Sequence, residues 1–320
     1  MILENRGDEI MTDIFVNLKR FDVHRDKGGV CPSDNAAKWI EEVVAKSIES
    51  GIGSLEQVNV VYMVPEALII SAQNKLAEYP ESKGRNLKIG CQSVFRENIK
   101  VGKNFGAFTS NMPAASAYQM GCRWSIIGHS EERRDKQEII GAFEPDWIKS
   151  IATRERCLSA VDYLINREVI SAFDQGMDVL LCVGETAEER GEGSFDNQKE
   201  NIQKALSGQL ERSLNGVKDF IAQRKIVIGY EPIWAIGPGK TPPGKDYIAF
   251  VSKFIKDKVK ELYGFDIPVV YGGGLKEENA AMIAGIDTID GGLVALTRFT
   301  GNIGFYVEDL KVIIEKYMNK

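Results

Sequence analysis

Short apolar stretches alternate along this chain with longer segments of helical periodicity. Eight runs are rich in apolar or β-branched residues and short enough to be buried strands: residues 13–18, 58–64, 87–94, 122–128, 177–183, 225–230, 267–271 and 288–294. Between them, apolar side chains recur at helical spacing over residues 35–50, 67–77, 113–121, 168–175, 196–215, 244–263, 277–284 and 303–317. Strands that alternate with helices in this way predict a parallel sheet.

The number of repeats favours a closed sheet over an open one. Eight strand–helix rounds fit a (β/α)8 barrel. The alternative, an open doubly wound sheet that binds a dinucleotide, requires a glycine-rich turn after the first strand. Residues 17–22, Asn-Leu-Lys-Arg-Phe-Asp, contain no glycine. We therefore predict a barrel, built as a single domain from the 320 residues, because such barrels often exceed about 250 residues.

Three segments exceed what such a barrel needs. Residues 20–33 lengthen the loop after the first strand, and residues 136–167 form an insertion of added helices or loops between the fourth and fifth strands. Residues 1–12 are expected to be a flexible N-terminal extension, with Met11 as a possible alternative start. The barrel itself is expected to span residues 13–320.

Composition and charge narrow the class of protein. The chain is 43% hydrophobic and 27% charged, which is typical of a globular protein in water. Its formal net charge of −6 gives no electrostatic support to binding of nucleic acid or an acidic membrane. No apolar run approaches the roughly 18 residues that can span a bilayer.

The N-terminus and the cysteines indicate a cytoplasmic protein. The first residues are too polar and acidic for a signal peptide. The five cysteines are scattered and odd in number, without a Cys-x-x-Cys motif, so neither structural zinc nor a disulfide framework is expected. Cys91, Cys122 and Cys182 lie in or beside apolar runs and are expected to be core residues.

Polar and glycine residues follow the predicted strands at the positions where a barrel gathers them. The C-terminal ends of barrel strands meet at one rim, where the loops of such enzymes build their sites. The strand ends supply Asn17 and Lys19 after the first, His129 after the fourth, Glu231 after the sixth, Gly272–Gly274 after the seventh and residues 291–296 around the eighth. Each alone has an ordinary structural explanation, such as a solvated lysine or a tight glycine turn. Their joint placement on one rim is harder to explain by chance.

The stretch after the sixth predicted strand suggests a base beneath a lid. Glu231 ends the strand, Pro232 prevents its continuation, and a loop follows with an apolar centre and a Gly-Pro-Gly end at residues 237–239. A loop that closes over a carboxylate expels water and strengthens charge interactions beneath it. A cation, a histidine and a carboxylate on one rim, beside glycines whose N–H groups suit an anion, predict proton transfer next to a carbonyl of a phosphorylated small molecule.

These motifs resemble the triosephosphate isomerase family, in the same order and over most of the chain. The motifs are Asn17-x-Lys19, Gly106-Ala107-Phe108-Thr109, Ile127-Gly128-His129-Ser130-Glu131, Cys182-Val183-Gly184-Glu185, Tyr230 to Lys240, Tyr271-Gly272-Gly273 and Ile289-Asp290-Gly291. The resemblance implies a (β/α)8 barrel and an aldose–ketose isomerase of glycolysis and gluconeogenesis. Such an enzyme interconverts dihydroxyacetone phosphate and glyceraldehyde 3-phosphate through an enediolate.

The resemblance also implies roles for individual residues. Glu231 is the implied base, His129 the implied electrophile, and Lys19 the implied cation near the substrate oxygens. Glu131 is expected to anchor Lys19. The residues implied for binding substrate and its phosphate are Asn17, Gly237, Gly274, Ala295 and Leu296. No metal and no organic cofactor are implied. A homodimer is implied, formed through the loop from Gly106 to Thr109.

The chain departs from the family pattern mainly around the phosphate. Gly274 stands where the family usually has Ser, and Ala295 and Leu296 stand where a pair of glycines follows the Val. Side chains at these two positions make positive φ costly and hinder a close approach to the phosphate. We expect Arg298 to serve as a substitute phosphate ligand. Glu132 adds one acidic residue to the usual His-Ser-Glu-Arg-Arg run.

Two other functions are therefore kept open. A related isomerase acting on a larger sugar phosphate, such as a four-carbon ketose phosphate, fits the altered phosphate residues. The other hypothesis is a barrel that has lost catalysis and only binds a phosphorylated ligand. The complete set of Lys19, His129 and Glu231 favours an enzyme over a binding protein.

Overall fold

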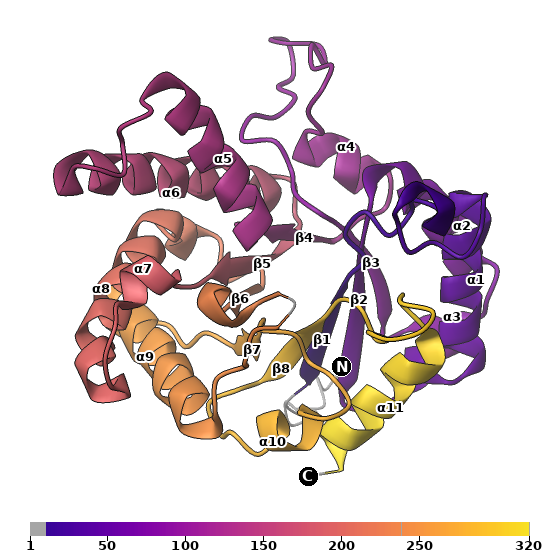
Figure 1. Cartoon of the computed structure of the whole chain (residues 1–320). Coiled ribbons are helices and arrows are strands. Elements are labelled where there is room, and N and C mark those ends of the chain that lie inside the picture. The colour runs from indigo at the N-terminus through magenta and orange to yellow at the C-terminus, as the bar shows by residue number, and fades with distance from the viewer. Residues whose placement is uncertain (1–10, 238, 320) are drawn as a thin grey trace, which may run out of the picture.

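Eight parallel strands close into a barrel in the computed structural model, which describes residues 11–237 and 239–319 (Figure 1). The strands are β1 (Thr12–Asn17), β2 (Val58–Val64), β3 (Leu87–Cys91), β4 (Trp124–Ile127), β5 (Asp178–Val183), β6 (Ile226–Tyr230), β7 (Val269–Tyr271) and β8 (Gly291–Val294). Each strand pairs with the next, and β8 pairs with β1. The predicted (β/α)8 barrel is confirmed. Most of the expected N-terminal extension lies outside the described residues, and Thr12 already belongs to β1.

Helices surround the barrel on its outside (Figure 1). They are α1 (Ala36–Glu49), α2 (Ile69–Ala77), α3 (Glu81–Gly84), α4 (Ala114–Gln119), α5 (Ser130–Phe143), α6 (Ile151–Asp174), α7 (Ala187–Arg190), α8 (Phe195–Ser213), α9 (Lys245–Tyr263), α10 (Ala280–Ala284) and α11 (Val307–Met318). No helix within residues 11–237 and 239–319 is both long and apolar enough to cross a membrane.

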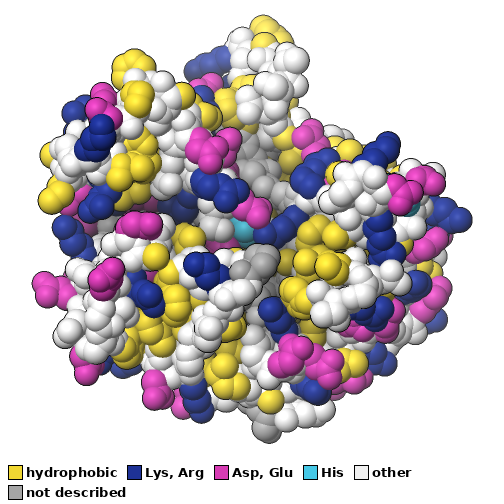
Figure 2. All heavy atoms as spheres, viewed as in Figure 1, with side chains coloured by type: hydrophobic (Ala, Val, Ile, Leu, Met, Phe, Trp, Pro, Cys, Tyr) yellow, Lys and Arg dark blue, Asp and Glu magenta, His cyan; other side chains and the backbone are white. Residues whose placement is uncertain are grey.

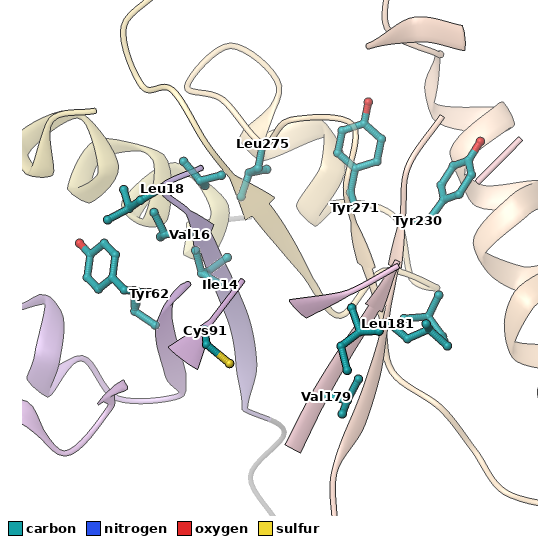
Figure 3. Packing of buried hydrophobic residues seen from close by; sticks show 14 of the residues in the cluster. Ile14, Val16, Leu18, Tyr62, Cys91, Val179, Leu181, Tyr230, Tyr271 and Leu275 are labelled. Carbon is teal, nitrogen blue, oxygen red and sulfur yellow. The ribbon is translucent and has the colours of Figure 1, made fainter. Parts of the chain in front are cut away.

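Side chains alternate between the barrel interior and the layer beneath the helices. Phe15 points into the barrel, where its ring meets that of Trp124 at 5.1 Å between centroids. Its neighbours Ile14 and Val16 point outward into the larger core that the helices cover (Figure 3). This period of two is what a strand buried on both faces requires. Cys91, Cys122 and Cys182 are buried free thiols, as the sequence predicts.

The segment at residues 136–167 consists of the second half of α5, a short connection and most of α6. Together α5 and α6 project beyond the other helices (Figure 1). The sequence pattern identified only the end of α6, because its buried face carries charged side chains. Asp162 and Glu168 are both buried, and Asp162 forms ion pairs with Arg133 of α5 at 2.6 Å and Arg212 of α8 at 2.7 Å. A charged buried face hides the apolar stripe by which a helix is recognised.

A buried charge cluster joins α5 to α6. Lys136 of α5 contacts Glu132 at 2.8 Å and Glu168 of α6 at 3.0 Å. Burial and the neighbouring Glu132 carboxylate raise the pKa of Glu168 from its ordinary 4.5 to about 9. One lysine therefore bridges two carboxyl groups, of which Glu168 keeps its proton at neutral pH.

Replacement of Glu168 should make stability less sensitive to alkaline pH. Between pH 4.5 and about 9 the folded carboxyl holds a proton that the unfolded chain has lost, so the free energy of unfolding falls as pH rises through this window. Glu168→Gln removes this dependence. Its stability relative to wild type should increase with pH from 5 to 9, by up to about 1 kcal/mol per pH unit.

Urea denaturation at several pH values measures this difference. Glu138→Gln, at an exposed position on α5, is the matched control and should follow the wild-type curve. A constant difference between Glu168→Gln and wild type across this range would contradict the raised pKa.

Candidate functional site

A cavity of about 1380 Å³ lies at the rim where the strands end. Its lining includes Lys19, His129 and Glu231, which lie just after the ends of β1, β4 and β6. Figure 2 shows a hollow near the middle of this face, with acidic, basic and histidine side chains gathered around it. The sequence predicted that these three side chains meet, and the barrel brings them to one cavity.

His129 and Glu231 face each other at the centre of the cavity. Nε2 of His129 lies 3.1 Å from Oε1 of Glu231, whose side chain is 3% exposed. The other carboxylate oxygen, Oε2, accepts a hydrogen bond from the backbone N–H of Ser130 at 2.9 Å. Ser130 is the first residue of α5, so a free donor at a helix N-terminus holds the carboxylate.

The same helix end sets the tautomer of the imidazole. His129 is the N-cap of α5, and its Nδ1 accepts a hydrogen bond from the backbone N–H of Glu131 at 3.4 Å. An accepting nitrogen carries no proton, so the neutral ring carries its proton on Nε2. His129 therefore presents an N–H group to the cavity, at the atom that faces Glu231.

Lys19 is held in a strained backbone conformation. Its φ is +41°, in the left-handed region that side chains rarely adopt. Its N–H donates to Oδ1 of Asn17 at 2.9 Å, and its carbonyl accepts from Nε2 of Gln92 at 2.8 Å. Strain of this kind persists only where neighbours impose it, and it is concentrated at functional sites. Gln92, which the sequence gave no reason to select, also contacts Oδ1 of Asn17 at 3.3 Å.

Glu131 anchors the Lys19 side chain, as the resemblance implied. Nζ of Lys19 donates to Oε1 of Glu131 at 2.8 Å. Burial favours the protonated acid, but the hydrogen bond and charge of Lys19 outweigh it, and the pKa of Glu131 lies below its ordinary value. The ion pair fixes the ammonium group at the rim of the cavity.

Glu132, the acidic residue that extends the motif, holds the turn before His129. Its Oε2 accepts from the backbone N–H of Gly128 at 2.6 Å, and its Oε1 accepts from Oγ of Ser93 at 2.8 Å. Gly128 has φ of +75°, which only glycine adopts without strain. The only sequence signal for this role was the extra carboxylate beside the histidine motif.

A buried carboxyl group, that of Glu185, holds the loop after β6. In the sequence this residue was noted only as part of a family motif. Glu185 is fully buried, and its Oε1 accepts from Nε1 of Trp234 at 2.8 Å, from Tyr230 at 3.0 Å and from Tyr247 at 2.7 Å. Burial raises the pKa of Glu185, although these donors oppose the shift. The guanidinium of Arg190 stacks on the Trp234 ring at 3.8 Å, so the loop is held on both sides of that ring.

Glycines and small residues line the opposite part of the cavity. Gly237, Gly274, Ala295 and Leu296, the residues expected to bind the phosphate, all belong to its lining. Gly274 has φ of +91°, so its backbone conformation disfavours the family's Ser. The cost expected from positive φ at Ala295 and Leu296 does not arise, because neither adopts it.

The expected substitute ligand, Arg298, points elsewhere. Its guanidinium pairs with Asp309 at 2.9 Å and stacks on the ring of Tyr306 at 3.9 Å, and Arg298 is not among the residues that line the cavity. The prediction that it contacts the phosphate is therefore wrong. Asp309 lies in the first turn of α11, a contact that local sequence does not reveal.

Lys276, which the sequence did not single out, supplies a cation instead. It follows the glycine triplet by two residues and lines the cavity. Its Nζ lies 4.1 Å from the centre of the Phe299 ring, another lining residue. Lys276 thus places positive charge next to the glycine N–H groups.

The geometry suits acid–base chemistry on a small anion. A buried carboxylate, an imidazole N–H and an ammonium group surround one space. Such a set can remove a proton from carbon and stabilise the charge that appears on oxygen. Among residues 11–237 and 239–319, no group of three or more His, Cys, Asp or Glu is placed to hold a metal ion.

Comparison with known proteins identifies the relatives. The family model described as "Triosephosphate isomerase" matches residues 33–301. A triosephosphate isomerase of Chlorobium phaeovibrioides is 32% identical over 243 residues, 74% of this chain and 81% of its own length. That of Oleidesulfovibrio alaskensis is 31% identical over 267 residues, 81% of this chain and 92% of its own.

A solved structure shares the fold. The crystal structure of triosephosphate isomerase from Bartonella henselae superposes with a TM-score of 0.65 at 23% identity, over 97% of this chain and 100% of that one. The family match begins after β1. The placement of Asn17 and Lys19 in the cavity therefore rests on the structure of this chain.

Proposed function

The chain belongs to the triosephosphate isomerase family, and from this premise we propose that it interconverts dihydroxyacetone phosphate and glyceraldehyde 3-phosphate through an enediolate. The observation that carries the proposal is the contact between Nε2 of His129 and Oε1 of Glu231, at 3.1 Å, at the centre of a cavity that Lys19 also lines. A base, a hydrogen-bond donor and a cation at one point are what this reaction requires.

In the proposed mechanism Glu231 moves one proton between adjacent carbons. Its carboxylate removes the proton from the carbon next to the carbonyl, and the electron pair forms the enediolate. Nε2–H of His129 donates to the developing oxyanion, and Lys19 adds positive charge beside it. His129 passes its Nε2 proton to this oxygen and takes the proton of the neighbouring hydroxyl in return, and Glu231 returns its own proton to the neighbouring carbon. The carbonyl has then moved by one position, and no atom is gained or lost.

Binding of the phosphate is assigned to the β7 and β8 side of the cavity. The backbone N–H groups near Gly274, Ala295 and Leu296, with Gly237 of the loop, are proposed to hold the phosphate oxygens. Lys276 supplies the positive charge that was expected from Arg298. Asn17 orients the substrate and supports the backbone of Lys19.

The loop after β6 is proposed to shield the reaction from water. Ile233 to Ala235 follow Glu231 after Pro232, and the Glu185–Trp234 hydrogen bond at 2.8 Å holds this loop in the position that the structure describes. A loop that exchanges this contact for one to the phosphate would close the cavity and strengthen the charge interactions inside.

A larger sugar phosphate is the second candidate substrate. The cavity volume of about 1380 Å³ exceeds the roughly 300–1,000 Å³ that ordinary ligand sites occupy. A four-carbon ketose phosphate would use the same proton transfer. Assays on glyceraldehyde 3-phosphate and on erythrulose phosphates, run side by side, separate the two: turnover of the tetrose alone would reject the triose.

Removal of the proposed base or electrophile should abolish most activity. Glu231→Gln keeps the size of the side chain but cannot take a proton, and His129→Gln removes the imidazole. We expect each to lower kcat by about 10²- to 10⁴-fold, as for loss of a general acid or base. His24→Gln, which changes the chain's other histidine, is the control. A Glu231→Gln enzyme within tenfold of wild type would exclude Glu231 as the base.

Two cations near the phosphate side should differ in their effect. Lys276→Ala should raise KM for glyceraldehyde 3-phosphate by about tenfold or more, the range expected for loss of one charged hydrogen bond. Arg298→Ala should leave KM unchanged, because Asp309 and Tyr306 hold that side chain. Steady-state kinetics measures KM for both variants. A raised KM in Arg298→Ala with an unchanged KM in Lys276→Ala would identify Arg298, and not Lys276, as the phosphate ligand.

A homodimer formed through the Gly106 to Thr109 loop is also proposed. The segment between β3 and α4 rises from the barrel (Figure 1), and Phe105, next to this loop, is 87% exposed. Phe108 packs on Phe95 at 5.7 Å, which supports the loop from below. An exposed apolar side chain on a projecting loop favours contact with a second copy.

Sedimentation analysis tests the dimer directly. Wild type should sediment at twice the 35.5 kDa chain mass, and Phe105→Asp should shift it toward the monomer. Phe143→Asp, at an equally exposed position on α5, should not. A monomeric wild type at micromolar concentration would reject the dimer.

A further inference from the structure

The catalytic cavity continues into a side chamber between α5, α6 and α8. We call this part the annex and define it by Gln137 of α5, Arg154 and Leu158 of α6, and Lys204, Ala205 and Gly208 of α8, all of which line the same cavity as the catalytic residues. The combined volume of about 1380 Å³ is far larger than a molecule of three carbons and one phosphate needs. The long α5 and α6 helices supply part of the wall of this larger cavity.

The annex lies on the side of the cavity away from the phosphate residues. Helix α5 begins at Ser130, directly after its N-cap His129, and Gln137 follows His129 by eight residues, roughly 12 Å along the helix axis. Strand β4 precedes both α5 and α6. The proposed phosphate residues lie beside β7 and β8, on the other side of the closed barrel from β4. The annex therefore opens from the reacting end of the substrate.

No part of a triose phosphate can fill this chamber. In glyceraldehyde 3-phosphate the reacting end is an aldehyde, whose carbon carries only hydrogen and oxygen beyond the chain. With the phosphate held on the β7 and β8 side, the molecule ends at His129 and Glu231. An occupant of the annex must be another molecule, or the continuation of a longer one.

Arg154 gives the annex an unused positive charge. It is partly buried, and within residues 11–237 and 239–319 its guanidinium forms no ion pair or side-chain hydrogen bond. Other cations of this wall are engaged: Arg212 is held by Asp162 at 2.7 Å, and Lys204 by Glu155 at 3.2 Å. A guanidinium partly removed from water without a partner is costly, and an oxyanion offsets that cost with paired hydrogen bonds.

The rest of the annex has the character of a ligand site. Leu158 and Val161 of α6 and Ala205 of α8 supply apolar wall, and Gly208 adds no side chain. Gln137 contributes a neutral donor and acceptor. An apolar chamber with one or two directed polar groups is the usual composition of a small-molecule site.

We propose that the annex binds a second oxyanion, a phosphate or carboxylate, at Arg154, next to the substrate in the catalytic cavity. Two sources share this chemistry. One is a separate small anion that binds beside the substrate. The other is the far end of a longer ketose that carries two anionic groups, in which the carbonyl moves between two internal carbons by the same proton transfer. The second source rests on the proposed function, and the first does not.

Calorimetry with inorganic pyrophosphate tests the site. Glycerol 3-phosphate, added at one equivalent per chain, first occupies the catalytic phosphate residues, so that the second site remains free for pyrophosphate. Wild type should then bind pyrophosphate with one site, and Arg154→Ala should weaken that binding by about tenfold or more. Arg156→Ala, two residues away on the exposed side of α6, should bind as wild type does.

The proposal is overturned if glycerol 3-phosphate abolishes pyrophosphate binding, or if Arg154→Ala binds as tightly as Arg156→Ala. The first outcome would place all anion binding at the catalytic phosphate residues. The second would mean that the annex binds without Arg154.

A second arm distinguishes the two sources. Ribulose 1,5-bisphosphate carries its carbonyl and the neighbouring C–H between two phosphates, and exchange of the proton on carbon 3 in D₂O can be followed by NMR. Exchange that falls at least tenfold in Arg154→Ala assigns the annex to the substrate's own second phosphate. No exchange, with pyrophosphate binding intact, assigns it to a separate anion. Turnover of glyceraldehyde 3-phosphate by wild type is measured separately, so failure of the triose reaction is distinguishable from failure of the annex.

Discussion

The junction between β4 and α5 holds the whole site together through the free N–H groups of one helix end. The N–H of Ser130 binds Glu231, the N–H of Glu131 binds Nδ1 of His129, and the side chain of Glu131 binds Lys19. The first N–H groups of any helix lack partners within it. Here they fix the positions of Glu231, His129 and, through the Glu131 side chain, Lys19, the proposed base, electrophile and cation. Glu132 then fixes the junction itself, through the N–H of Gly128.

This arrangement also shows what must move. With Nε2 of His129 and Oε1 of Glu231 only 3.1 Å apart, a substrate cannot lie between them while the carboxylate stays on Ser130. In the proposed mechanism Glu231 therefore has to turn from the helix end toward the substrate. Trp234 of the loop that follows donates a hydrogen bond to Glu185, and Arg190 stacks on its ring. The proposed turn of Glu231 and the proposed closure of the loop involve neighbouring residues, so we expect the two movements to be coupled.

The sequence was informative where chemistry depends on position along a strand. The eight strands, the barrel and the meeting of Lys19, His129 and Glu231 follow from period, strand ends and closure. The sequence was misleading where a side chain binds partners that are distant in the sequence. Arg298 is adjacent to the phosphate residues in sequence, but Asp309 and Tyr306 hold it away. Lys276 and Gln92 carry no local signal, because their contacts arise only when separate strands are brought together, and Glu132 was marked only as an extra carboxylate beside the histidine motif. Helix α6 was underestimated because it buries Asp162 and Glu168 where an apolar stripe would be expected.

Isomerisation in D₂O tests the central claim, that Glu231 carries a proton between two carbons, most directly. When dihydroxyacetone phosphate is converted in D₂O, a carboxylate base exchanges part of the abstracted proton with solvent before returning it. NMR should show deuterium on carbon 2 of the glyceraldehyde 3-phosphate formed by wild type, and product and exchange should both form at least about a hundredfold more slowly with Glu231→Gln. Product that contains no solvent deuterium, or exchange by Glu231→Gln at the wild-type rate, would contradict the account.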